Sequence, residues 1–418
     1  MSDSEKTPLW TAPPRPAWLS AINQEGSYLN LPTVVPLDEA SLLDHARHAT
    51  GLDDFGHGQW REPFRVLLKA LEEEAQLTLM GRLMARSDII VWLSTRLQVT
   101  DLLQRHPEIL DEQVTAPMII AGLPRSGTSI LFELMSQDPE VGVPLTWEAI
   151  FPCPPPERAS YDSDPRIDKA HKLVTQWNRV APEFASMHQM GGRIPAECGL
   201  LMVGTFISDH IAASHQTPSY SMWCAQADYL PVYAYHKQIL QILQWKNPRQ
   251  RWLLKAPEHQ VHLETLLQVY PDACIVQTHR DPLKCMASTT SLMGTLYHMR
   301  SDQPFNAELF ENIIMGEATA QRLGKVIEQR ESGVVPAARI VDSRYQDLMN
   351  DPIACIENIY THFQMTLSKK ALSNMREYLE GKPKGKYGIH HYTINEQRSK
   401  ERPLFKRYQA LYDVPDEI

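Results

Sequence analysis

The sequence predicts an α/β fold: a three-layer sandwich in which helices cover both faces of a central, mostly parallel sheet, with a helical N-terminal extension. Two observations support this. After about residue 113, short apolar runs of strand length alternate with long helical intervals, and parallel strands need such crossovers. Before residue 112, apolar residues recur with helical spacing. We therefore expect two parts, residues 1–112 and 113–418.

The first part is predicted to be an arm followed by helices. Its start is rich in proline and aromatic residues, including Trp10 and Trp18, and has no regular period. We expect this start to be an extended arm packed on the main body. From roughly residue 37 to 112 the apolar residues fall at i, i+3, i+4 and i+7. Examples are Phe64, Leu67, Leu68 and Leu71.

The second part contains the predicted sheet. Four strand candidates stand out, residues 118–121, 252–254, 273–278 and 339–341, and a further short one lies at 141–143. The intervals between the first four are long enough for crossover helices, which favours parallel pairing. Residues 152–245 are unusually rich in aromatic residues and methionine. We expect this insertion to cover the sheet and line an apolar pocket.

The composition excludes several classes of function. The chain has 418 residues, of which 43% are hydrophobic and 22% charged, and its formal net charge is −9. No global basic field is available to hold nucleic acid or an anionic membrane. The first residues do not resemble a secretory signal, and no apolar run has membrane-spanning length. We therefore expect a cytoplasmic protein with no membrane span and no nucleic-acid partner.

Cysteine and histidine patterns argue against a metal centre. The 6 cysteines are scattered without a C-x-x-C pair, and the 16 histidines include no H-E-x-x-H pattern. Scattered cysteines in such a chain are typical of reduced, buried thiols. We expect no metal ion to take part in the chemistry.

A loop at residues 122–129, with the sequence GLPRSGTS, is the strongest candidate site. It follows a predicted strand and precedes a predicted helix, so backbone N–H groups and the positive end of the helix dipole converge there. Phosphate and sulfate suit such a site. The spacing of the two glycines matches the ATPase loop, but that loop needs lysine where residue 128 is threonine. The cation is instead Arg125, inside the loop.

A second feature also departs from the ATPase pattern. The strand that ends at Thr278 continues into HRDP at residues 279–282. A cation therefore stands where a kinase or ATPase needs a magnesium-binding carboxylate. Both departures disfavour a magnesium-dependent nucleotidase.

These two segments resemble the motifs of sulfotransferases that use 3′-phosphoadenosine-5′-phosphosulfate (PAPS). Residues 124–129 resemble the phosphosulfate-binding loop, and residues 278–282 with Ser288 resemble the second motif, an arginine followed eight positions later by serine. The likeness spans roughly residues 114–418 and is closest to a large group of bacterial sulfotransferases. It implies the P-loop sulfotransferase fold, with PAPS as co-substrate.

The resemblance assigns the donor-binding residues. The 5′-phosphosulfate would be held by Arg125, Ser126, Gly127, Thr128 and Ser129. Arg280 and Ser288 would hold the 3′-phosphate, although an ion pair of Arg280 with the neighbouring Asp281 is the structural alternative. Tyr345 would lie near the adenine, and Lys386 would belong to the basic segment that closes the nucleotide site.

The base that takes the acceptor's proton has two candidates. Glu148 lies beyond the loop helix at a distance where tyrosylprotein and heparan sulfate sulfotransferases carry a catalytic glutamate, and burial there would raise its pKa. His259 follows a strand end, as a histidine does in animal cytosolic sulfotransferases, but it lies four residues after Lys255 instead of two. Lys255 would contact the sulfuryl group or the bridging oxygen. Its structural alternative is an ion pair with Glu258.

The acceptor is expected to be a small hydroxylated molecule. Trp147, His188 and Glu197 are expected to contact it, and the aromatic insertion favours a sterol, phenol or lipid-like alcohol. Sulfuryl transfer needs in-line positioning, cations and a base, and no metal. A P-loop kinase and a catalytically silent adenosine-bisphosphate-binding protein are the alternatives. The sequence leaves a homodimer open.

Overall fold

The computed structural model describes residues 10–306, 316–382 and 399–418. Its N-terminal part is helical, as predicted, and comprises α1 (Ala17–Gly26), α2 (Leu31–Val34), α3 (Glu39–Thr50), α4 (Arg61–Glu73), α5 (Leu79–Arg105) and the 3₁₀ turn η1 (Pro107–Asp111). The predicted extended arm reaches only to Pro16, because α1 begins at the next residue and buries Leu19 against the body. Trp10 does pack on the body, with its ring centroid 5.8 Å from that of His298.

Five parallel strands form the central sheet in the order β2-β3-β1-β4-β5. They are β1 (Met118–Gly122), β2 (Val141–Gly142), β3 (Arg251–Lys255), β4 (Cys274–His279) and β5 (Ile340–Arg344). The predicted parallel sheet is therefore confirmed. The last strand begins one residue later than expected, because Arg339 ends the 3₁₀ turn η6 (Ala337–Arg339).

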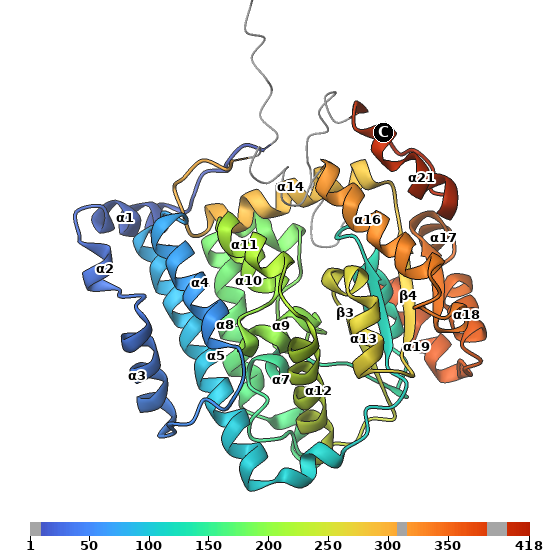
Figure 1. Ribbon diagram of the computed structural model, residues 1–418, viewed down its shortest axis with the longest axis horizontal. Helices are drawn as coiled ribbons and strands as arrows, with labels where there is room; N and C mark the ends of the chain where they lie inside the picture. The colour runs from blue at the N-terminus through green and yellow to red at the C-terminus, as the bar shows by residue number, and fades with distance from the viewer. Residues whose placement is uncertain (1–9, 307–315, 383–398) are drawn as a thin grey trace, which may run out of the picture.

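Alternate residues of the central strand pack on opposite faces of the sheet, as the pleat of a strand requires. Met118 and Ile120 join one hydrophobic cluster with α6 (Thr128–Met135), α18 (Pro352–His362) and α19 (Lys369–Gly381). Ile119 and Ala121 join another with α5, α12 (Leu230–Trp245) and α13 (Leu263–Val269). The sheet thus lies between two helical layers (Figure 1), which confirms the three-layer sandwich.

The insertion between β2 and β3 adds a group of helices and 3₁₀ turns to the body. It contains α7 (Thr146–Ile150), η2 (Tyr161–Ser163), α8 (Arg166–Val180), η3 (Pro182–Ser186), α9 (Cys198–Met202), η4 (Val203–Thr205), α10 (Asp209–Ser214), α11 (Pro218–Ala225) and α12. The remaining elements are η5 (Pro257–Val261), α14 (Pro282–His298), α16 (Gly316–Glu331), α17 (Tyr345–Asn350) and α21 (Arg402–Tyr412). Buried residues of α4 and α5 belong to the same cluster as residues of β1 and β3, so one core joins the extension to the sheet.

Two further expectations concern cysteines and membrane spans. All 6 cysteines are free thiols, and only Cys153 is not fully buried. Within the described ranges, no helix is both long and apolar enough to cross a bilayer.

The strand register brings the predicted site residues to one edge of the sheet. Gly122 pairs with Thr278, and Ile120 pairs with Lys255. The carboxyl ends of β1, β3 and β4 therefore meet at the loop that follows β1. Open α/β sheets bind ligands at this kind of edge.

Candidate functional site

The loop after β1 has three residues with positive φ angles, and two of them are glycines. Gly122 has φ 156°, and a Cβ atom there would lie 2.1 Å from Thr278 Oγ1. Gly127 has φ 97° and is the N-cap of α6. Arg125 also adopts a left-handed φ, 70°, which is uncommon for a residue with a side chain and often marks a functional turn.

Hydroxyl groups fasten this loop to the next strand. Ser126 Oγ donates to the carbonyl oxygen of Leu123 at 2.6 Å and lies 2.6 Å from Thr278 Oγ1. Ser126 is buried, whereas Arg125, Gly127, Thr128 and Ser129 line a cavity of about 1120 Å³. The start of α6 therefore opens its N–H groups onto this cavity, as an anion site requires.

Arg125 and Ser288 are in direct contact. The Nε of Arg125 donates to Ser288 Oγ at 3.0 Å, and its Nη1 donates to the carbonyl oxygen of Met187 at 3.1 Å. The structure thus brings together two residues that the sequence assigned to opposite ends of the donor. It also ties the backbone next to His188 to the loop.

Arg280 is held by a carboxylate from the C-terminal segment. Its Nε and Nη2 donate to Glu417 at 2.9 and 2.8 Å, and its Nη1 donates to the carbonyl oxygen of Arg125 at 3.0 Å. Burial alone would lower the pKa of Arg280, but Glu417 more than reverses this effect, so the pKa lies above its ordinary value. The alternative ion pair of Arg280 with Asp281 does not form, because the Asp281 carboxylate pairs with Arg402 at 2.7 Å.

Tyr345 lies against Arg280 at the other side of the loop. Its ring centroid is 3.7 Å from the guanidinium carbon of Arg280. A Cβ atom at Gly127 would lie 3.0 Å from the Tyr345 ring, so the glycine also makes room for this ring. Both Arg280 and Tyr345 line the cavity. Lys386, the last predicted donor residue, lies outside the described residues.

Lys255 and Glu197 form an ion pair next to the start of α6. Lys255 is 2% exposed at the end of β3, and its ammonium group contacts Glu197 and lies 3.4 Å from Ser129 Oγ. Burial would raise the pKa of Glu197, but the attraction of Lys255 outweighs it, so the pKa of this carboxyl lies below its ordinary value. The alternative pair of Lys255 with Glu258 does not form.

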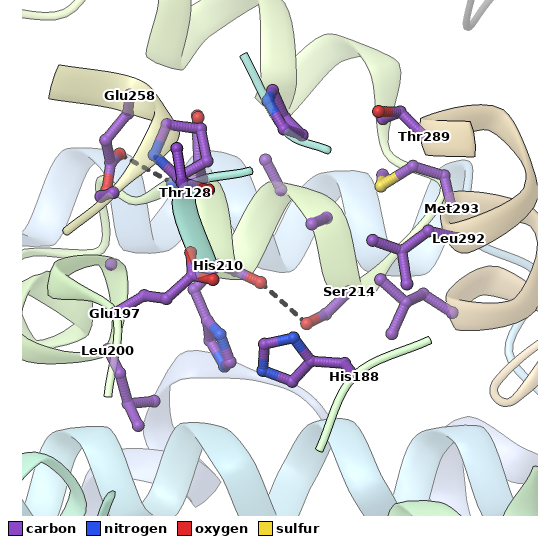
Figure 2. A pocket seen from close by; sticks show the side chains of 18 of the residues that line it. Thr128, His188, Glu197, Leu200, His210, Ser214, Glu258, Thr289, Leu292 and Met293 are labelled. Atoms are coloured by element: carbon purple, nitrogen blue, oxygen red, sulfur yellow. Dashed lines mark hydrogen bonds between the residues drawn. The ribbon is translucent and has the colours of Figure 1, made fainter. Parts of the chain in front are cut away.

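Two imidazoles lie beside Glu197 in the cavity (Figure 2). Burial lowers the pKa of His188, and Lys255 and Arg125 add to this effect. Burial and Arg300 lower the pKa of His210 to about 4. Both rings are therefore neutral at neutral pH. His210 was not predicted, and no local motif marks it; it comes from α10, which packs beside α14 in the cavity wall.

Glu148 lies away from this cavity. Its side chain is fully buried, Oε2 accepts a hydrogen bond from the Leu145 N–H at 2.8 Å, and Oε1 accepts one from Arg249 at 3.0 Å. Burial raises its pKa more than Arg249 lowers it. Glu148 caps the start of α7 and is not among the cavity residues. Trp147 is likewise fully buried, beside Tyr161 and outside the cavity wall.

His259 is also outside the cavity wall. It is fully buried, and its Nδ1 lies 3.0 Å from the hydroxyl of Tyr233. Burial moves its pKa well below the ordinary value. The structure therefore brings Lys255, Glu197 and His188 to the loop, but neither of the two residues predicted as bases.

Polar and apolar side chains share the wall of the cavity. In Figure 2, Glu197, His188 and His210 lie across from Thr289, Leu292 and Met293 of α14. Apolar walls also come from α8 and α10, including Val174, Trp177 and Ala213. No cluster of potential metal ligands occurs in the part of the chain that the structure describes. The arrangement fits an anionic donor at the loop and an apolar acceptor beside it.

The chain is similar to known sulfotransferases. A model described as "Sulfotransferase family" matches residues 117–369. The omega-hydroxy-beta-dihydromenaquinone-9 sulfotransferase Stf3 of Mycobacterium tuberculosis is 25% identical over 300 residues, which cover 68% of this chain and 71% of that protein.

Two solved structures share the architecture over nearly their whole length. Sulfotransferase STF1 from Mycobacterium tuberculosis matches with a TM-score of 0.77 and 29% identity, covering 88% of this chain and 98% of that one. Sulfotransferase STF9 from Mycobacterium avium matches with a TM-score of 0.78 and 27% identity, covering 91% and 97%.

Proposed function

The chain belongs to the sulfotransferase family, and we propose that it transfers a sulfuryl group from PAPS to the hydroxyl of a small hydrophobic molecule. The observation that carries the proposal is the convergence of Ser129, Lys255 and Glu197 at the start of α6. There, an anion site, a buried cation and a carboxylate border one largely apolar cavity. Sulfuryl transfer between two oxygens needs these three groups.

The loop residues fit the donor's phosphosulfate. Gly122 and Gly127 keep the loop close to β4 and to Tyr345, and Arg125 supplies a cation at its tip. The 3′-phosphate would replace the Glu417 carboxylate on Arg280, because a guanidinium fork binds either group. Tyr345 orients Arg280 and borders the donor. Lys386 stays a prediction from the resemblance.

Glu197 is the base in this proposal, in place of Glu148 and His259. The acceptor oxygen attacks sulfur and forms the new S–O bond, while the bond from sulfur to the bridging oxygen of the donor breaks. The acceptor's proton moves to the Glu197 carboxylate. Adenosine 3′,5′-bisphosphate leaves with the negative charge, which Lys255 and Arg125 stabilise.

Lys255 couples donor binding to this proton transfer. In the structure Lys255 pairs with Glu197, and this attraction lowers the carboxyl's pKa. A donor at the loop draws Lys255 toward its bridging oxygen. Glu197 then loses part of the attraction that lowers its pKa, so it becomes a stronger base when the donor is in place.

The acceptor occupies the rest of the cavity. His188 and His210 are neutral imidazoles that can hydrogen-bond its hydroxyl, and apolar side chains of α8, α10 and α14 enclose its body. The relative named above acts on a hydroxylated menaquinone derivative. We accordingly propose a lipid-like, sterol or phenolic alcohol as the acceptor class.

Calorimetry with adenosine 3′,5′-bisphosphate and 5′-AMP, both without magnesium, tests the donor assignment. We expect clear preference for the bisphosphate, and transfer from labelled PAPS to hydrophobic alcohols. Binding of the bisphosphate with no transfer to any acceptor would indicate a silent binding protein. Magnesium-dependent binding of ATP with no preference for a 3′-phosphate would indicate a kinase and refute the proposal.

A further inference from the structure

One face of α16 borders part of the cavity. Four of its residues line the cavity with the spacing i, i+3, i+4 and i+7, and residues so spaced share one helix face. They are Ala318, Gln321, Arg322 and Lys325. The opposite face of α16 is buried through Leu323, Val326 and Ile327. The helix therefore turns two cationic side chains toward the cavity.

The electrostatic neighbours of these cations in the cavity are buried groups. Neither Arg322 nor Lys325 forms an ion pair with a described residue. Burial lowers the pKa of His262 to about 3, with smaller effects from Lys325 and Arg322, so this neighbouring ring is neutral.

Two carboxyl groups border the same cavity as these cations. They belong to Glu258 and Asp209. Burial, with Asp209 beside it, raises the pKa of Glu258 well above the ordinary value. Burial also raises the pKa of Asp209, against the attraction of Arg322. Because burial disfavours the charged forms of both carboxyl groups, an anionic ligand can compete with them for Arg322 and Lys325.

The wall of the same cavity also has apolar parts. They include Leu292 and Met293 of α14 and Met222 and Ala225 of α11. The loop residues, Glu197 and the α16 face all border the same cavity of about 1120 Å³. One elongated molecule can therefore contact all three.

We propose that the acceptor is an amphiphile with an anionic end group, a carboxylate or phosphate, which Arg322 and Lys325 bind while its hydroxyl lies at Glu197. This inference rests on the proposed function, because it concerns the same cavity. The anionic group adds a charge-assisted interaction to the apolar contacts of the body. It also gives the acceptor one orientation, with the hydroxyl toward the loop.

A binding titration without donor tests the inference. The ligands are a long-chain hydroxy acid and its methyl ester, below their aggregation concentrations, and Trp92 and Trp177 in the cavity wall supply the fluorescence signal. We expect the acid to bind about ten-fold tighter than the ester, and the preference to fall as salt rises. The double variant R322Q/K325Q should remove the preference. The control K369Q/K370Q removes the same charge from exposed positions on α19. This control should retain the preference for the acid over the ester.

The outcomes separate this inference from the proposed function. Equal binding of acid and ester by the wild type, at every salt concentration, would overturn it without any variant. An unchanged preference for the acid in R322Q/K325Q would also overturn it, because these cations would then not bind the acid. If R322Q/K325Q kept this preference but lost affinity for the bisphosphate, the cations would bind the donor instead. Preferred binding of the acid through these cations, with no sulfate transferred to any alcohol, would support the anionic subsite and refute the sulfotransferase activity.

Discussion

Removing the carboxylate of Glu417 should tighten binding of adenosine 3′,5′-bisphosphate. Glu417 accepts two charge-assisted hydrogen bonds from Arg280, at 2.9 and 2.8 Å, and the two side chains are 17% and 13% exposed. The pair is more buried than a surface ion pair, so its contribution to the free energy should be larger than that of a surface pair. It is also more exposed than an ion pair in a protein core. We take its net contribution as about 1–2 kcal/mol.

The donor must break this pair before its 3′-phosphate reaches Arg280. The variants Glu417→Gln and Glu417→Ala should therefore bind the bisphosphate about 5- to 30-fold tighter, as the same free energy implies. Affinity for 5′-AMP, which has no 3′-phosphate, should change much less. Isothermal titration calorimetry measures both dissociation constants directly.

Asp416→Asn is the matched control. This substitution removes the same charge one residue earlier in the chain. The Asp416 carboxylate pairs with Arg402 at 3.0 Å and not with Arg280. Its bisphosphate affinity should match that of the wild type. If Glu417→Ala weakened bisphosphate binding, the reasoning would be refuted, because Glu417 would then hold Arg280 in place for the phosphate.

Other predictions concern the base and the cation. Glu197→Gln should lower kcat by about 10²- to 10⁴-fold, the usual range for general-base catalysis, with an unchanged dissociation constant for the bisphosphate; retained turnover would remove Glu197 from the mechanism. Glu148→Gln should instead lower the free energy of unfolding by about 1–3 kcal/mol, since a buried hydrogen-bonding partner is altered, and denaturant melts measure this while the folded enzyme keeps its kcat. The pKa of Glu197 in the free enzyme lies below its ordinary value. The carboxylate is therefore ionised at neutral pH and takes up a proton only when the pH falls below the ordinary range of a glutamate. The kcat/KM of the wild type for PAPS, which reports the free enzyme, should therefore stay level between about pH 6 and pH 8, and a titration of kcat/KM centred near neutrality would contradict this assignment. Arg280→Ala should weaken bisphosphate binding by more than about ten-fold and leave 5′-AMP binding nearly unchanged.

The sequence predicts the sheet and its loop well because both depend on local patterns. Strand-length apolar runs and a strand-glycine-helix order place residues 122–129 at the sheet edge without any knowledge of distant contacts. Lys255 and Arg280 follow from the same logic, since each directly follows or ends a strand that neighbours β1. Parallel strands bring their carboxyl ends together, so the positions of these two cations could be expected.

The choice of base could not be made from sequence because it depends on a long-range contact. Glu148 is close to the loop along the chain, but its carboxylate is used to cap α7. A bridge between Leu145 and Pro195 instead joins this region to the segment that carries Glu197. That bridge spans about fifty residues of the insertion, and no local signal predicts it. Glu417 is likewise far from Arg280 in sequence, in a segment without a motif.

Transfer of label from PAPS to a hydrophobic alcohol, with a magnesium chelator present, tests the central claim most directly. The wild type should form the labelled sulfate ester and release adenosine 3′,5′-bisphosphate, while Glu197→Gln binds the bisphosphate but forms almost no ester. A labelled ester formed equally well by Glu197→Gln would contradict the proposed mechanism. Phosphate transfer from ATP that needs magnesium, with no sulfate transfer, would contradict the activity itself.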